Sequence, residues 1–102
     1  MNFSMIKQAL ELRSNLEKTQ KELAKMTVEA QSDKGEVKVT ATGRQKILSI
    51  KISPEVIDPA KSKQLEKLVL KAVTDALDKS KKLAEKHLGK LTGGIKIPGI
   101  TD

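Results

Sequence analysis

The spacing of the apolar residues changes twice along this chain of 102 residues, and that change most constrains the fold. Near the N-terminus the apolar positions step by four and three. They are Met5, Ala9, Leu12, Leu16, Leu23 and Met26, with Thr19 in the one polar slot. This heptad spacing predicts a helix over residues 3–26 with one narrow apolar seam. Such a seam needs a partner helix or a sheet to cover it.

In the middle of the chain, apolar residues alternate with polar ones. The alternating positions are Val28 and Ala30 before the turn sequence Ser32-Asp33-Lys34-Gly35, Val37, Val39 and Ala41 after it, and Leu48, Ile50 and Ile52 after Gly43-Arg44-Gln45. Alternation with a period of two is typical of strands that bury one face. Residues 28–52 are therefore expected to form a three-stranded antiparallel meander.

Helical spacing returns after Ser53-Pro54 and Asp58-Pro59, each of which places a capping residue before a proline. It predicts a second helix over residues 59–91, about 50 Å long. Because a globule of this chain length has a diameter of roughly 33 Å, the far part of that helix should project or pack on another subunit. Residues 92–102 are expected to be flexible or to form a short docking strand. The predicted fold is a single α+β domain over residues 1–102, with the order α-β-β-β-α.

The composition argues against an enzyme. The chain has no cysteine, so disulfides, thiolate metal ligands and a cysteine nucleophile are excluded. His87 is the only histidine and has no triad partner near it in sequence. Asp75 and Asp78 share a helical face, but they are expected to pair with Lys71, Lys79 or Lys82 rather than to hold a metal. We therefore expect no catalytic residue, metal site, cofactor or small-molecule substrate.

The first residues are too polar for a signal peptide, and no run approaches the roughly 20 apolar residues that span a bilayer. A soluble, cytoplasmic protein without a membrane partner is expected.

Net charge points to an anionic partner. Twenty Lys and Arg against thirteen Asp and Glu give +7, and residues 59–91 alone carry nine basic and four acidic side chains. The candidate DNA-binding residues are Lys79, Lys81, Lys82, Lys86 and Lys90 in the second helix, with Lys18, Lys21 and Lys25 in the first. A lysine-rich face can also serve only to keep a protein soluble, and composition favours neither role over the other.

The residue types that are scarce narrow the mode of binding. Base reading commonly uses arginine, and the chain has only Arg13 and Arg44. Single strands are commonly held by aromatic stacking, and Phe3 is the only aromatic residue. Contact with the backbone of double-stranded DNA, with low sequence specificity, fits best.

A set of residues in order along residues 5–100 resembles the YbaB/EbfC family of bacterial nucleoid-associated proteins. The set comprises Gly35, Val37, Val39, Gly43, Ile50, Ile52, Pro54, Leu65 to Val69, Ala72, Asp75-Ala76, Gly93-Gly94 and Pro98-Gly99. Thr74 departs from the family, which often has Asn there. The resemblance implies a homodimer whose helices project like the arms of tweezers, no catalytic activity, and binding along duplex DNA in the nucleoid, with an influence on gene expression and nucleoid organisation.

Two other classes stay open from the residues alone. One is a chaperone of prefoldin-like layout, against which the lysine-rich second helix and the three strands argue. The other is an RNA- or ribosome-associated factor, which competition between duplex DNA, structured RNA and single strands would separate.

Overall fold

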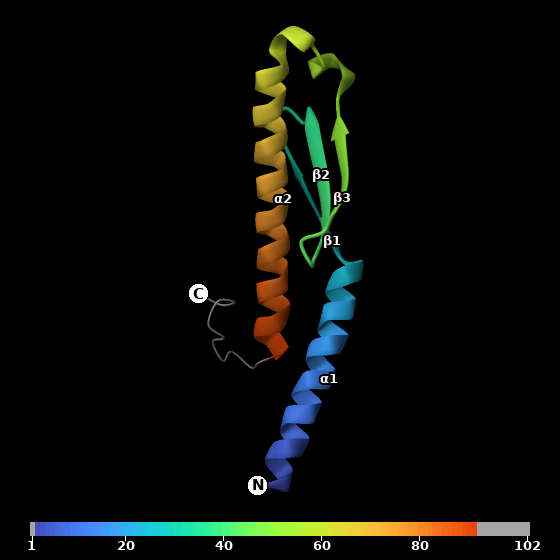
Figure 1. Ribbon diagram of the computed structural model, residues 1–102, viewed down its shortest axis with the longest axis vertical. Coiled ribbons are helices and arrows are strands. Elements are labelled where there is room, and N and C mark those ends of the chain that lie inside the picture. The colour runs from blue at the N-terminus through green and yellow to red at the C-terminus, as the bar shows by residue number, and fades with distance from the viewer. Residues whose placement is uncertain (1, 92–102) are drawn as a thin grey trace.

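A computed structural model of the chain describes residues 2–91. Its elements are α1 (Phe3–Lys25), β1 (Thr27–Gln31), β2 (Val37–Thr42), β3 (Ile47–Ile52), two short 3-10 turns (Pro54–Val56 and Pro59–Lys61) and α2 (Ser62–Leu91), as Figure 1 shows. The predicted α+β fold with the order α-β-β-β-α is confirmed. The prediction for residues 92–102 lies outside the described residues.

The second helix begins later than predicted, at Ser62 instead of Pro59. Asp58 does cap a helical turn, because its carboxylate accepts a hydrogen bond of 3.0 Å from the backbone N–H of Ala60. That turn, however, is a single 3-10 turn over Pro59–Lys61, and α2 follows it directly.

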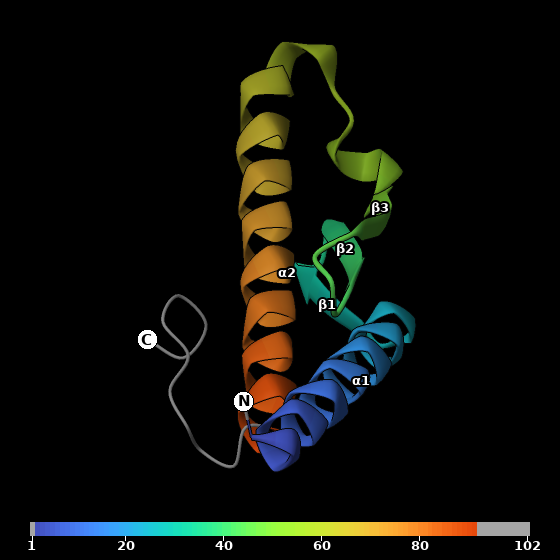
Figure 2. The same cartoon turned by 60° about the horizontal axis from the view of Figure 1, so that its bottom comes forward.

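The small hydrophobic core lies between α2 and two of the three strands. The sheet has the order β1-β2-β3 with antiparallel pairs, and α2 contacts β1 and β2 along one face (Figures 1 and 2). Its buried members are Ala30, Val37, Val39 and Ala41 from the sheet and Ala72 and Ala76 from α2. Alanine on both sides lets the helix backbone approach the sheet closely, and well-packed contacts of this kind supply most of the stability of a small domain.

Strand β3 differs from the predicted alternation of Leu48, Ile50 and Ile52. Ile47 and Ile52 pack against the core, whereas Leu48 and Ile50 are exposed. A bulge between Thr40 and Ala41 shifts the register, and a bulge changes which side chains share a face. Ile50 lies opposite Val39, which is fully buried, yet Ile50 is 45% exposed. The helix therefore covers β2 and leaves Ile50 of β3 bare.

Ser80 joins α2 to the turn between β2 and β3. Its hydroxyl is fully buried, donates a hydrogen bond of 2.6 Å to the carbonyl oxygen of Thr42 and accepts one of 2.9 Å from the N–H of Gln45. Gln45 has a positive φ of 61°, a conformation that non-glycine residues adopt only when the surroundings hold it. Ser80 therefore fixes the turn between β2 and β3 to α2.

The second half of α1 packs on α2, and its first half projects (Figures 1 and 2). Along the heptad seam, Leu12 is exposed, Leu16 is half-buried and Leu23 is buried. The C-terminal end of α1 is fixed by Gly43, whose N–H nitrogen lies 3.0 Å from the carbonyl oxygens of both Leu23 and Met26. A Cβ at Gly43 would lie 2.8 Å from the Leu23 oxygen, so the contact requires glycine.

The far part of the second helix was predicted to project or to pack on another subunit; it extends past the sheet (Figure 1), and packing on another subunit stays a prediction. Within the described residues, the last turns of α2 lie against α1 of the same chain, and Leu88 there is buried. The element that projects farthest is the N-terminal half of α1, because α1 extends past the end of α2 (Figure 1).

Replacing Ser80 tests the junction between helix and sheet. Ser80→Ala removes both hydrogen bonds of a buried hydroxyl, so the free energy of unfolding should fall by about 1 to 2 kcal/mol. Chemical denaturation at a fixed protein concentration measures the change. Ser14→Ala, at an exposed position inside α1, is the matched control and should leave stability unchanged or slightly raised, since alanine favours helix. Equal stability of both variants would contradict the role given to Ser80.

Candidate nucleic-acid interface

The C-terminal third of α2 presents a row of lysines. Lys82, Lys86 and Lys90 follow one another at intervals of four residues, and Lys79 lies one turn before them. Because a helix turns about 100° per residue, these four share one face and Lys81 lies away from it. The row begins where Ser80 meets the end of β2 and continues past the sheet (Figure 1).

A second row of lysines lies on α1. Lys18, Lys21 and Lys25 are exposed, while Leu16 is half-buried and Leu23 is buried on the seam. Their spacing of three and four residues places the lysines together on the side of α1 opposite the seam. The structure thus brings both sets of predicted lysines to the part of the molecule where the two helices meet.

None of the eight candidate lysines forms an ion pair within residues 2–91. The ion pairs there are Arg13–Glu17 at 3.4 Å and Lys71–Asp33 at 3.2 Å. The expectation that Asp75 and Asp78 pair with Lys71, Lys79 or Lys82 was therefore wrong. Lys71 reaches Asp33 across to the sheet instead. The lysines of both rows are therefore not held in ion pairs within the described residues.

Lys79 differs from the other members of its row. Its ammonium donates a hydrogen bond of 2.8 Å to the backbone carbonyl oxygen of Glu29 in β1. An ammonium group has three donors, so the contact leaves it able to bind a further oxygen. The side chain is nevertheless held against the sheet, whereas Lys82, Lys86 and Lys90 make no such contact in the described structure.

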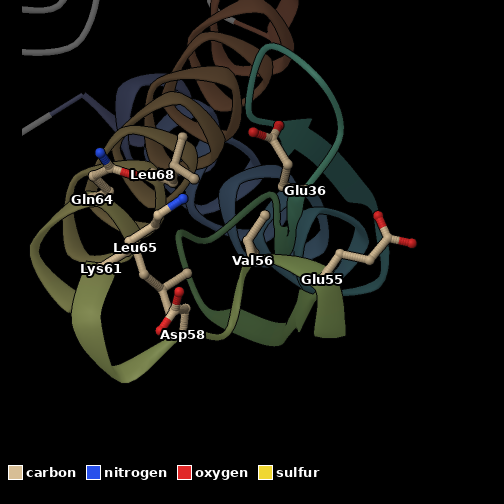
Figure 3. A pocket seen from close by; sticks show the side chains of 8 residues that line it. All are labelled: Glu36, Glu55, Val56, Asp58, Lys61, Gln64, Leu65 and Leu68. Carbon is tan, nitrogen blue, oxygen red and sulfur yellow. The ribbon is translucent and has the colours of Figure 1, made fainter.

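The opposite end of the molecule carries carboxylates. A depression of about 190 Å³ lies between the 3-10 turns and the start of α2. Figure 3 shows the carboxylates of Glu36, Glu55 and Asp58 spread around it, with Lys61 also lining it. Hydrogen bonds from its own backbone N–H and from the Ser32 hydroxyl hold the pKa of Glu36 below its usual value. Negative charge at neutral pH makes this end a poor site for phosphate.

Within the described residues the structure holds no cluster suited to metal or acid–base chemistry. No group of three or more His, Asp or Glu side chains there could hold a metal ion. The ring atom Nε2 of His87 is buried without a hydrogen-bond partner. No helix in the part of the chain that is described is long and apolar enough to cross a membrane.

An apolar groove beside β3 is a feature that sequence reasoning missed. It has a volume of about 560 Å³ and is lined by Ile52, Ser62, Leu65, Glu66, Val69, Leu70 and Val73. Leu70 is 67% exposed. The signal in the sequence is that Leu70 lies outside the helical spacing of the core residues Leu65, Leu68, Ala72 and Ala76, and so gives α2 a second apolar face.

Known proteins are similar in sequence to this chain over nearly its whole length. The YbaB/EbfC DNA-binding family matches residues 1–95. A nucleoid-associated protein of Pelotomaculum thermopropionicum is 41% identical, over 94% of this chain and 91% of its own length. Another, of Desulforamulus reducens, is 45% identical over 94% and 91%. An uncharacterised protein from Helicobacter pylori shares the fold, with a TM-score of 0.61 at 17% identity, over 91% of this chain and 95% of that one. The chain therefore belongs to the YbaB/EbfC DNA-binding family.

Proposed function

We propose that this protein binds duplex DNA as a homodimer, through contacts between lysines and phosphates and with low sequence specificity, and that it acts in the bacterial nucleoid. The observation that carries the proposal is the pair of lysine rows, which form no ion pairs within residues 2–91. Lysines that are not held in ion pairs can replace the counterions that surround DNA, and the release of those counterions drives binding.

Lys82, Lys86 and Lys90 form the principal contact. They extend over about 12 Å of helix, at about 1.5 Å per residue. A helix lying along a DNA strand would cover three to four phosphates in that length, since the phosphates repeat about every 3.4 Å along the axis. Lys79 ranks below these three because it is already bound to Glu29, and Lys81 ranks below them because it lies off the row. Lys18, Lys21 and Lys25 of α1 provide the second contact.

Low sequence specificity follows from the scarcity of groups that read bases. Of the two arginines, Arg13 is engaged with Glu17, and Arg44 lies in the turn between β2 and β3. Lysine acts on phosphate as a point charge, whereas the planar guanidinium of arginine reads guanine with two hydrogen bonds. The prefoldin-like and RNA-associated alternatives are not favoured, since the family is one of DNA-binding proteins.

The homodimer forms through the apolar groove beside β3, with a second copy of the chain as occupant. The chain alone buries few large side chains, and its radius of gyration of 18.6 Å exceeds the roughly 13 Å expected for a compact domain of about 100 residues. Ile50 and Ile57 are exposed as well as Leu70. An apolar groove, with further apolar side chains left exposed, is typical of an interface between proteins.

Removing two lysines from the row tests the DNA contact. For the double variant Lys82→Gln and Lys86→Gln, the slope of log affinity against log salt should become shallower by about 0.9 for each phosphate that the variant no longer binds. Binding to random and chosen duplexes should weaken alike. Gel shifts across a salt series measure both effects.

The matched control is Lys63→Gln with Lys67→Gln, which removes the same charge at the same spacing from exposed positions near the start of α2. Its slope should stay close to that of the wild type. If both double variants lowered affinity and slope equally, binding would depend on net charge alone, and the row would not be the site.

A charge in the groove tests the dimer. Leu70→Glu should convert the protein to a monomer of 11.2 kDa at micromolar concentration, since a carboxylate buried in an apolar interface is strongly unfavourable. Sedimentation equilibrium gives the mass. Gln64→Glu adds the same charge at an exposed position on another side of α2 and should stay dimeric. A wild-type monomer with native stability at micromolar concentration would contradict the proposed dimer.

A further inference from the structure

The first half of α1 is an apolar helix that the rest of the described chain leaves uncovered. We call residues 3–15 the arm; every residue in it is exposed. Its large apolar side chains are Phe3, Met5, Ile6, Leu10 and Leu12, of which Phe3 is 83% and Met5 64% exposed. In both views the N-terminal end of α1 lies farthest from the sheet (Figures 1 and 2). A stretch this apolar on a protein surface marks a site of association.

The exposed seam of the arm continues an interface that already exists within the chain. Along one seam, Met5, Ala9 and Leu12 are exposed, Leu16 is half-buried and Leu23 is buried, and α1 contacts α2. Leu23 is 1% exposed and Leu12 is 45% exposed. The same helical face is therefore buried at Leu23 and exposed at Leu12, about three turns away. Heptad spacing with apolar residues at intervals of four and three is the pattern that packs against another helix.

The charge of the arm does not suit DNA or an anionic lipid surface. The arm has two basic residues, Lys7 and Arg13, and one acidic residue, Glu11. Arg13 is engaged with Glu17. The lysine row of α1 begins only at Lys18, after the arm ends. The apolar half and the cationic half of this helix therefore fit different partners.

We propose that the arms of two copies of this chain pair side by side in antiparallel orientation through the seam, and so link one dimer to another. The linking of dimers rests on the proposed groove dimer. The pairing of arms itself needs only α1.

Antiparallel pairing matches side chains by size. With Ala9 of one copy opposite Leu12 of the other, the two-fold axis also places Leu12 opposite Ala9, and Met5 opposite Leu16. A small side chain opposite a large one fills each layer of the seam, as close packing requires. Parallel pairing would instead place Ala9 against Ala9 and leave a void. Beside the antiparallel seam, Gln8 faces Asn15 of the other copy on one flank and Arg13 faces Ile6 on the other, so no two like charges meet.

The arm and the groove can bind different copies at once. The groove lies along the first half of α2, near Ile52, and the arm lies toward the other end of a molecule 67 Å long (Figure 1). A dimer closed through the groove leaves its two arms available. Arms that join separate dimers produce assemblies that can hold two DNA duplexes together.

Sedimentation velocity of the full chain over a range of concentrations tests the pairing without DNA. The wild type should show a mass that rises from that of a dimer to that of a dimer pair and beyond. Leu12→Glu should stop at the dimer. Ser14→Glu adds the same charge on another face of the arm and should assemble like the wild type. Leu12 is exposed, so the substitution should leave the fold intact, which circular dichroism checks.

Three results would overturn the proposal. One is a wild-type mass that stays at two chains at every concentration, as expected if another segment or another protein covers the seam. Another is assembly of Leu12→Glu equal to that of the wild type. The third is a Leu12→Glu protein that is monomeric, which would mean that the arms pair within the groove dimer.

The register has its own test because the chain has no cysteine. A short thiol cross-linker should join Gln8→Cys protein to Asn15→Cys protein in a mixture, because the antiparallel register brings these two positions together on one flank of the seam. Efficient joining of Gln8→Cys protein to Arg13→Cys protein would overturn the antiparallel register, because these positions lie on opposite flanks of the seam and approach each other only in a parallel pair.

A second readout separates this inference from the proposed DNA contact. Leu12→Glu should bind one short duplex with unchanged affinity, yet fail to produce the transfer of fluorescence energy between two differently labelled duplexes that the wild type brings together. The lysine variants should bind a single duplex more weakly. Without DNA, their arms should still assemble like those of the wild type. Energy transfer retained by Leu12→Glu would overturn the role of the arms in joining duplexes.

Discussion

The close contact of α2 with β1 and β2 through alanine and valine sets the geometry of the molecule. Ala72 and Ala76 lie in one core with Ala30, Val37, Val39 and Ala41, so the helix backbone comes near β1 and β2 and leaves β3 only partly covered. An apolar groove beside β3 is the direct result. The same contact uses only the middle of a helix of 30 residues. The C-terminal turns of α2 extend past the sheet, where they contact α1 and carry the lysine row.

Much of this architecture was readable from the sequence because each element has its own apolar period. The seam of α1, the alternation of β1 and β2, and the prolines before α2 all correspond to observed elements. The face of β3 was not predictable, because the bulge at Thr40 and Ala41 has no signal in the alternation. The sequence also did not indicate that the first half of α1 extends past the end of α2. Which helix extends farther depends on how α1 and α2 pack. The apolar seam of α1 indicates that another element must cover it, but the sequence does not show which element that is.

Only part of the candidate site could be predicted from the sequence. Charge counting finds the lysines of both helices, and helical spacing places Lys82, Lys86 and Lys90 on one face. It does not find that Lys79 is held by the backbone of β1, or that Lys71 pairs with Asp33. Both contacts join residues that are far apart in sequence. Electrostatic partners of this kind become visible only when the fold brings the elements together.

The contact between Lys79 and Glu29 also bears on solubility. β1 is an edge strand, and an edge strand presents unpaired backbone groups onto which a strand of another molecule can add. The ammonium of Lys79 occupies the carbonyl oxygen of Glu29 on this strand. An incoming strand would have to displace a charged group and leave it without that hydrogen bond. One lysine of α2 therefore disfavours the addition of a strand at the β1 edge of the sheet.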